Sequence, residues 1–315
     1  MDIYIYTPQG FETGGIELLH QLCHELNNHE DINAYIWYSD PNKAYIPSAY
    51  AEYGNEFRVT DLPPKGSVLI FPEAWAKLLN DKKYEDYIKV LYWESVYWYE
   101  YWIPQDQYMV FPAGTIHMVQ SYYACEWLKD KANINAIMVT DYLNDEYMNA
   151  DLSKPRKRQI LYNPKKGLEV TKRIMAELPN EKFIPIVNMT VSEIKSLMEE
   201  SMLYIDFGNH PGKDRIPREA AMCGCCVITN REGSAAYYED VAILNEYRID
   251  MICENSLDEA VRMIEYCLNH YDDYLLSADF MEYRFRIIDE KVNFKDGVMA
   301  LLKKLKEVEI CNSQE

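Results

Sequence analysis

Three basic side chains and two glycines gather between an apolar run and a segment of helix-forming residues. The bases are Lys213, Arg215 and Arg218, and the glycines are Gly208 and Gly212. An arginine guanidinium presents a planar fork that fits phosphate oxygens, and a lysine adds a compact positive charge. Since the chain as a whole has a formal net charge of -19, this local excess of bases favours a site for a small anion over a surface loop whose bases pair with nearby acids.

A second basic turn, from Asn163 to Gly167, holds Lys165 and Lys166 between a predicted strand and a predicted helix. Lysines are unfavourable at the start of a helix, because the positive end of the helix dipole prefers acids. A bound anion would explain them. Taken alone, the turn is more typical of two solvated surface lysines.

A third loop, from Thr7 to Gly15, ends in the pair Gly14 and Gly15 and opens a predicted helix. Glycines let the backbone approach a ligand closely, and a helix N-terminus favours negative charge. The dinucleotide fingerprint G-x-G-x-x-G is absent from it. The loop fits a phosphate contact and a plain strand-to-helix turn equally well.

The composition narrows the classes of function. An excess of 51 acidic over 32 basic residues argues against nucleic acid and against an anionic membrane surface as partners. No apolar run is long enough for a transmembrane segment, and the start lacks a basic region followed by an apolar one, so a cytoplasmic location is expected. The eight cysteines show no zinc-ligand spacing and predict buried, reduced thiols. We expect neither a metal nor a resident cofactor.

Short apolar runs alternate with amphipathic stretches, which is typical of parallel sheets covered by helices. In the first half, strands are expected at 2–6, 34–38, 67–71, 90–93, 116–120 and 136–139, and helices at 14–27 and 122–131. In the second half, strands are expected at 159–162, 183–187, 202–207 and 225–229, and helices at 166–178, 191–200, 217–223, 256–269 and throughout 271–308.

A polar stretch with a proline, residues 151–158, separates the two halves. It predicts two α/β domains, 1–152 and 153–315. Ligands of open parallel sheets bind beyond the carboxyl ends of the strands. The expected site is therefore the cleft between the two domains.

Taken together, these motifs resemble the GT-B glycosyltransferases, in particular the large retaining group called family 4. The stretch from Pro217 to Ile228 looks like the second half of that group's E-G-F-G-x-P-x-x-E-A-M-A-C-G-x-P-V pattern. The turns Lys165-Lys166-Gly167 and Gly14-Gly15-Ile16-Glu17 look like its two glycine turns, and residues 231–235 like its small loop after the next strand. The motifs keep the family's order over most of the chain.

The resemblance implies the GT-B architecture, with two Rossmann-like parallel-sheet domains. The first domain would bind the acceptor, and the second would bind a nucleotide-diphosphate sugar with UDP or GDP as its nucleotide. The implied reaction moves a hexose, with retained configuration, to a glycan or another hydroxyl acceptor. The donor would be a co-substrate and no cofactor would be needed.

The donor site is assigned to loop residues of both halves. By resemblance, Glu219 matches the family's ribose-binding Glu. Because charge develops on the leaving diphosphate, we expect Lys166 and Arg215 to stabilise it as the catalytic residues, without a metal. The other expected donor-binding residues are Gly14, Gly15, Asn163, Lys165, Gly212, Lys213, Arg218 and Ser234.

Three positions depart from the family pattern. Pro211 stands where the first Glu of the family's E-x7-E motif contacts the donor sugar, and Asn163 lies near the place of a family Arg. Trp93-Glu94-Ser95 stands where the family often has a His. These departures leave the donor and the retention of configuration open.

An aromatic run from Tyr92 to Trp102 follows a predicted central strand and holds three of the six tryptophans. Aromatic faces stack on the C–H surfaces of sugars, while carboxylates bind their hydroxyls, so Trp93, Glu94 and Trp98 are the expected acceptor-binding residues. A core or oligomer contact explains the run equally well. Glu94 or Glu12 would be the base if the transfer inverts configuration.

Two other functions stay open at this point. An epimerase or phosphorylase could use the same scaffold, because a fold does not determine its chemistry. Alternatively, the chain could be a catalytically silent GT-B-like binding or regulatory protein. The missing first Glu favours the silent protein, whereas the basic loops and Glu219 favour an enzyme.

Overall fold

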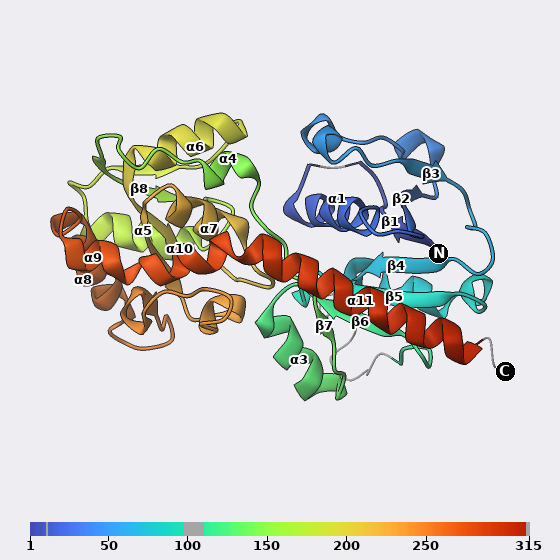
Figure 1. Ribbon diagram of the computed structural model, residues 1–315. Helices are drawn as coiled ribbons and strands as arrows, with labels where there is room; N and C mark the ends of the chain where they lie inside the picture. Colours follow the sequence, from blue (N-terminus) through green and yellow to red (C-terminus); the bar gives the residue numbers. More distant parts are fainter. Residues whose placement is uncertain (11, 98–109, 313–315) are drawn as a thin grey trace. The chain divides into compact units, whose positions relative to one another are not determined.

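The computed structural model describes residues 1–10, 12–97 and 110–312 of the 315-residue chain. The chain forms two compact units, Met1–Asp141 with Val292–Glu315, and Tyr142–Lys291. Each unit is a parallel sheet covered by helices (Figure 1). The expected α/β class with two Rossmann-like sheets is confirmed.

The first unit is built on a seven-stranded sheet in the order β3-β2-β1-β4-β5-β6-β7. Every pair in it is parallel. The strands are β1 (Asp2–Tyr6), β2 (Asn33–Tyr38), β3 (Phe57–Val59), β4 (Val68–Pro72), β5 (Ile88–Trp93), β6 (Ile116–Val119) and β7 (Ile137–Met138). The chain winds outward from β1 in one direction and from β4 in the other, so the winding reverses between these two strands.

The helices of this unit are α1 (Gly14–Leu26), α3 (Tyr122–Ala132) and α11 (Glu290–Asn312), joined by short 3₁₀ helices. These are η1 (Pro41–Lys43), η2 (Ser48–Tyr53), η3 (Glu73–Asn80) and η4 (Lys82–Tyr84). Helix α1 starts where the hydroxyl of Thr13 accepts a hydrogen bond from the Ile16 amide at 3.4 Å. That cap satisfies one of the donors that a helix start leaves open.

The second unit has a five-stranded parallel sheet in the order β12-β11-β10-β8-β9. Its strands are β8 (Lys157–Tyr162), β9 (Phe183–Pro185), β10 (Ser201–Asp206), β11 (Cys226–Asn230) and β12 (Arg248–Ile249). Its helices are α4 (Asp145–Met148), α5 (Leu168–Glu177), α6 (Val191–Glu199), α7 (Arg215–Met222), α8 (Ser256–Asn269), α9 (Tyr274–Asp279), α10 (Met281–Ile288), η5 (Gly233–Ala236) and η6 (Asn245–Tyr247). Here the winding reverses between β8 and β10.

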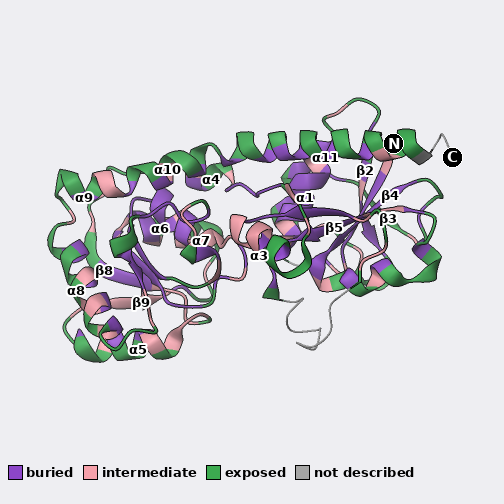
Figure 2. Ribbon diagram, turned by 90° about the horizontal axis from the view of Figure 1, so that it is seen from below, coloured by how far each residue is buried: buried purple, intermediate pink, exposed green. Residues whose placement is uncertain are grey.

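The central strands are buried along most of their length, whereas the helices expose their outer faces (Figure 2). Strands covered on both sides read as continuous apolar runs, which is why the sequence located them. Two strands escaped prediction. Phe57–Val59 is three residues long and exposed throughout, and Arg248–Ile249 has only two residues.

The two units divide between Asp141 and Tyr142, whereas the predicted boundary lies between residues 152 and 153. Leu143 and Tyr147 are buried in the core of the second unit, so the chain enters it about ten residues earlier. The tail forms three helices rather than one, with breaks at Phe280 and Asp289. From Val292 onward, α11 belongs to the first unit.

The packing of α11 explains its place in the first unit. The helix buries its apolar residues Phe294, Val298, Leu301, Leu302 and Leu305. Gly297 lies so close to the carbonyl of Met138, at the end of β7, that an added Cβ would overlap it. A side chain at this position would therefore push the helix from the sheet.

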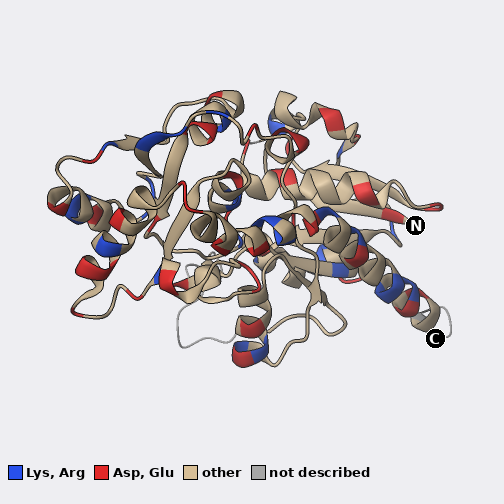
Figure 3. Ribbon diagram, turned by 60° about the vertical axis from the view of Figure 1, so that its left-hand side comes forward, with Lys and Arg blue, Asp and Glu red and all other residues tan. Residues whose placement is uncertain are grey.

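Acidic and basic residues are interspersed along the chain in both units, including α11 (Figure 3). The net charge is thus not confined to one helix or strand. Among the described residues, no helix is both long enough and apolar enough to cross a membrane.

Candidate functional site

Three loops meet at the carboxyl edge of the second unit's sheet. They follow β8, β10 and β11, which are neighbours in the sheet. Because the winding reverses between β8 and β10, this edge is where doubly wound sheets leave room for a ligand. The loops carry most of the residues that the sequence assigned to the donor.

The first two loops touch backbone to backbone. Gly167 has φ +58°, and an added Cβ there would overlap the carbonyl of Phe207. On the opposite side, an added Cβ at Gly208 would overlap the stem of Lys166. Both glycines are therefore needed for the close approach that brings the basic turn beside the loop after β10.

Lys166 is held by a carboxylate of the neighbouring loop. Its Nζ lies 2.5 Å from Oδ2 of Asp214, and both side chains are about one-quarter exposed, at 26% and 24%. The same Oδ2 lies 2.7 Å from Nδ1 of the buried His210. Asp214 is the N-cap residue of α7 but makes no capping bond, because its carboxylate is engaged with these two cations. The lysine thus remains at the surface of the site with a defined anionic partner.

Arg218 and Lys213 share a buried carboxylate. Nη1 of Arg218 lies 2.7 Å from Oε2 of Glu290, and Nζ of Lys213 lies 2.8 Å from its Oε1. Arg218 also donates to the carbonyls of Asp214 and Lys213, and it has no exposed surface. The guanidinium is therefore occupied in the interior of this unit. This arrangement revises the expected donor contact of Arg218, which here has a structural position.

The third loop fastens the second by short hydrogen bonds. Ser234 donates from Oγ to the carbonyl of Gly212 at 2.7 Å, and its amide donates to the carbonyl of His210 at 2.8 Å. Asn230 donates from Nδ2 to the carbonyl of Gly208 at 2.7 Å. Ser234 is completely buried. Its hydroxyl holds the backbone at Gly212, so Ser234 supports the loop after β10 and does not face a ligand.

The remaining predicted donor residues of the second unit are exposed or partly exposed. Oδ1 of Asn163 accepts from the amide of Lys165 at 3.0 Å, so the asparagine holds the turn while the Lys165 side chain is exposed. Arg215 is the first residue of α7 and is partly exposed. Glu219 is partly exposed one turn later on α7. Its charge lies close enough to Tyr147 to raise the pKa of that phenol, after the larger effect of the burial of Tyr147.

The first unit gathers carboxylates at the carboxyl edge of its own sheet. Glu94 follows β5, and its carboxylate fills the space beside the Cα of Gly15 in the first turn of α1. Glu73 follows β4 and accepts hydrogen bonds from the Glu94 amide at 3.1 Å and from the Ser95 hydroxyl at 2.8 Å. Gly15 therefore accommodates a carboxylate of the same unit. That carboxylate occupies the positive end of the α1 dipole, where the sequence had placed donor phosphate for Gly14 and Gly15.

Glu73 makes the stability of the fold depend on pH. Burial raises its pKa from 4.5 to about 7, although hydrogen bonds from Ser95 and Glu94 act in the opposite direction. A carboxyl whose pKa is raised on folding stabilises the fold most at low pH, and that contribution is lost as pH rises toward about 7. We expect the lost stability to be about 3 kcal/mol between about pH 5 and about pH 8. Urea unfolding at these two pH values measures it.

Two matched variants show whether Glu73 or other groups cause this pH dependence of stability. Glu73→Gln should lose less stability than the unmodified protein over the same pH interval. Glu85→Gln, at an exposed position of the same unit, should keep the unmodified dependence. Equal slopes for Glu73→Gln and Glu85→Gln would show that Glu73 is not the source.

Comparison with solved structures places both units in a known architecture. A glycosyltransferase from Rickettsia africae ESF-5 is 15% identical, with a TM-score of 0.70 and coverage of 98% of both chains. HepE from Anabaena, solved with UDP-glucose, is 11% identical with a TM-score of 0.66, covering 96% of this chain and 99% of that one. The chain has the GT-B fold.

A further GT-B match is the sucrose-phosphate synthase of Thermosynechococcus elongatus, 12% identical with a TM-score of 0.63. It covers 99% of this chain and 100% of its own. No protein-family model matches the sequence, and a search of curated proteins finds no similar sequence. The likeness is therefore one of fold, at identities too low to transfer a reaction.

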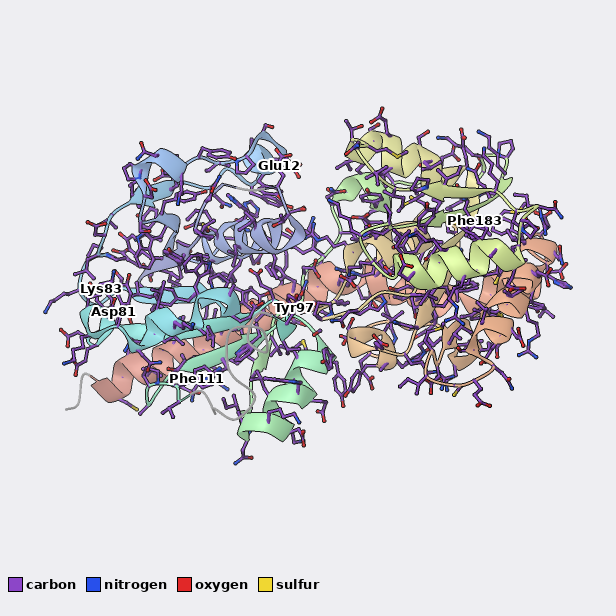
Figure 4. All side chains as sticks on the ribbon, turned by 180° about the vertical axis from the view of Figure 1, so that it is seen from behind. Glu12, Asp81, Lys83, Tyr97, Phe111 and Phe183 are labelled. Atoms are coloured by element: carbon purple, nitrogen blue, oxygen red, sulfur yellow. The ribbon has the colours of Figure 1, made fainter. Side chains whose placement is uncertain are left out.

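The GT-B fold of this chain buries one of the predicted acceptor residues. Trp93 has no exposed surface; its Nε1 donates to Nδ1 of His117 at 3.1 Å, and its ring packs on Phe111 and Trp127. Figure 4 marks Phe111. An indole enclosed in this way belongs to the core and offers no face to a sugar. Of the other two acceptor residues, Glu94 is partly exposed and Trp98 lies outside the described residues.

Four carboxylates and a histidine of this GT-B chain were not foreseen as site residues. Asp206, His210 and Asp214 recur at intervals of four residues, and that spacing was a signal that reasoning from the basic residues overlooked. Glu73 and Glu290 gave no signal at all. Glutamates are numerous in a chain this acidic, and only packing distinguishes a buried one from its solvated neighbours.

Proposed function

We propose that this chain transfers a hexose from a nucleotide-diphosphate sugar to a hydroxyl group of a carbohydrate or glycoconjugate. The observation that carries the proposal is the meeting of the loops after β8 and β10, which sets Lys166 and Arg215 at the winding reversal of the second sheet. A diphosphate needs such fixed cations, and this edge of a doubly wound sheet is where nucleotides bind.

The solved structures support the choice of donor. HepE, which shares the fold, has been solved with UDP-glucose and with UDP. We therefore propose a UDP-sugar as donor, with a GDP-sugar as the alternative. Glu219, which is partly exposed on α7, is the proposed contact for the ribose hydroxyls, and the exposed Lys165 adds positive charge nearby.

The proposed reaction breaks the bond between the sugar anomeric carbon and the diphosphate oxygen. The diphosphate leaves with the bonding electrons, the acceptor oxygen bonds to the anomeric carbon, and the hydroxyl proton is released. Negative charge develops on the leaving oxygen, so cations held near it lower the barrier. We assign that role to Lys166 and Arg215, with no metal ion required, because a lysine and an arginine can supply the positive charge.

The acceptor is assigned to the first unit. Glu94 stands at the carboxyl edge of that sheet with its backbone held by Glu73, and carboxylates bind sugar hydroxyls well. We propose retention of configuration, following the family resemblance. Inversion would instead require a base, and Glu94 is then the preferred candidate because its position is fixed, in contrast to the exposed Glu12.

A panel of UDP-, GDP-, ADP- and CMP-sugars tests the proposal. A donor present at about a hundredfold its dissociation constant should stabilise the protein by about 2.7 kcal/mol, which thermal unfolding detects. The stabilising donor should then release its nucleoside diphosphate, and proton NMR of the product gives the anomeric configuration. Stabilisation without any release would favour the catalytically silent binding protein. The absence of stabilisation by every donor would overturn the proposal.

A further inference from the structure

A histidine of the second unit has no exposed surface and lies between two carboxylates. Nδ1 of His210 is 2.7 Å from Oδ2 of Asp214, and its Nε2 is 3.7 Å from Oδ1 of Asp206. Only Nδ1 is within hydrogen-bond distance of its carboxylate, but two negative charges this near both favour the positively charged form of an imidazole. The arrangement therefore favours the imidazolium.

The position of this histidine is set from three directions. Asp206, at the end of β10, accepts from the Tyr204 hydroxyl at 2.8 Å and from the Gly208 amide at 3.1 Å. The His210 carbonyl accepts from the Ser234 amide. Gly233, at φ +56°, leaves room for that carbonyl, because an added Cβ would overlap it. The imidazole thus has little freedom to turn away from either carboxylate.

The carboxylate next to His210 is also the one that holds Lys166. Oδ2 of Asp214 lies within hydrogen-bond distance of both cations. With His210 protonated, the carboxylates of Asp206 and Asp214 are balanced by two positive charges. With His210 neutral, one negative charge is left beside Lys166, and an anionic ligand would be repelled.

The surroundings of His210 determine which form prevails. Burial by itself lowers the pKa of His210, but the hydrogen bond with Asp214 and the charges of Asp206 and Asp214 outweigh it. The pKa of His210 therefore lies above its ordinary value, with Lys166 as the one charge acting against it. Burial would raise the pKa of Asp214, yet His210 and Lys166 together lower it.

We propose that His210 is a positioning residue for the donor diphosphate, acting through Asp214 on Lys166. When Lys166 turns from Asp214 toward a phosphate, the imidazolium keeps the Asp214 carboxylate balanced and prevents it from competing with the ligand. The donor then binds tightly only while His210 holds its proton. This inference rests on the proposed function, since it takes a nucleotide-diphosphate sugar as the ligand of Lys166.

The test measures the dissociation constant of UDP-glucose by calorimetry from about pH 6 to about pH 9. The diphosphate of this donor is esterified at both ends, so its charge is constant over the range. In the unmodified protein, affinity should be constant at low pH and then fall as His210 loses its proton. A donor that raises the pKa of His210 by about one unit corresponds to a fall of about tenfold.

Two histidine variants make the comparison specific. His210→Gln should bind UDP-glucose about tenfold more weakly at low pH, with little further change as pH rises. His270→Gln, at an exposed position of the same unit, should reproduce the unmodified profile. A His210→Gln profile that matches the unmodified one overturns the inference while the proposed donor stands. No binding by the unmodified protein at any pH overturns both.

A measurement on the unmodified protein does not depend on how the variant folds. Among the six histidines, NMR titration should show one whose pKa is above the usual range and rises further with saturating UDP-glucose. The rise follows because Lys166, whose charge lowers the pKa of His210, turns away from Asp214 to the phosphate, which adds negative charge nearby. Six pKa values unaffected by bound donor would overturn the inference.

Discussion

Replacing Lys166 by alanine should lower turnover of the nucleotide-sugar donor by about 10²- to 10³-fold, which is the usual loss when one group that stabilises developing negative charge is removed. Lys166 is the basic side chain that the loops after β8 and β10 jointly position, with its stem against Gly208 and its ammonium group on Asp214. Initial rates of nucleoside diphosphate release, measured at saturating donor, report this loss directly.

The loss of turnover should depend on the position of Lys166 and not merely on the removal of one positive charge. Lys172 lies six residues further along, on α5, and pairs with Glu169 at an exposed position. Lys172→Ala removes the same charge from the helix that follows the Lys166 turn and should leave the rate unchanged. Circular dichroism and thermal unfolding should show that both variants are folded. A Lys166→Ala rate within about twofold of the unmodified rate would exclude Lys166 from the leaving-group role.

Replacing Glu290 by glutamine should lower the free energy of unfolding by about 3–5 kcal/mol, because it leaves the buried guanidinium of Arg218 without its counter-charge. Glu290 is 2% exposed and is the shared partner of Arg218 and Lys213. The loss is large since the guanidinium of Arg218 has no path to solvent in the folded state. Urea unfolding, with its slope checked for two-state behaviour, measures the change.

An exposed glutamate on the neighbouring helix α10 provides the control. Glu282 pairs with Arg286, with the two side chains 53% and 43% exposed, so Glu282→Gln should cost less than about 1 kcal/mol. The double variant Arg218→Met with Glu290→Leu removes both charges and should recover much of the loss. Equal costs for Glu290→Gln and Glu282→Gln would mean that the buried group contributes no more than a surface pair.

Most of the strands could be predicted from the sequence, because their apolar runs are long and covered on both sides. Asp2–Tyr6, for example, has the predicted bounds. The strand Phe57–Val59 could not be predicted, since exposed residues carry no burial pattern. The last helix has the expected periodicity, but periodicity does not say which core a helix covers. The close fit of Gly297 against Met138, together with the burial of the helix's apolar face, assigns it to the first unit.

The site divides in the same way. The strand-to-helix turn around Lys166 could be located from residue types alone, because glycine and lysine between an apolar run and an amphipathic stretch mark such a turn. The role of Arg218 could not, since a guanidinium that binds phosphate and one that lies on a buried Glu290 have the same sequence signature. Trp93 is a similar case, because an aromatic residue at a strand end suits a sugar face and a core equally well.

What the sequence determined by itself was the α/β class, the loops that carry charge and the glycines that let them approach. These follow from local properties: apolar periodicity, helix dipoles and backbone freedom. What only the tertiary structure decided was which charge meets which. Lys166 joins Asp206, His210 and Asp214 in one alternating series because two loops touch at Gly167 and Gly208. Charges interact through distances in space, and those distances exist only once the strands are paired.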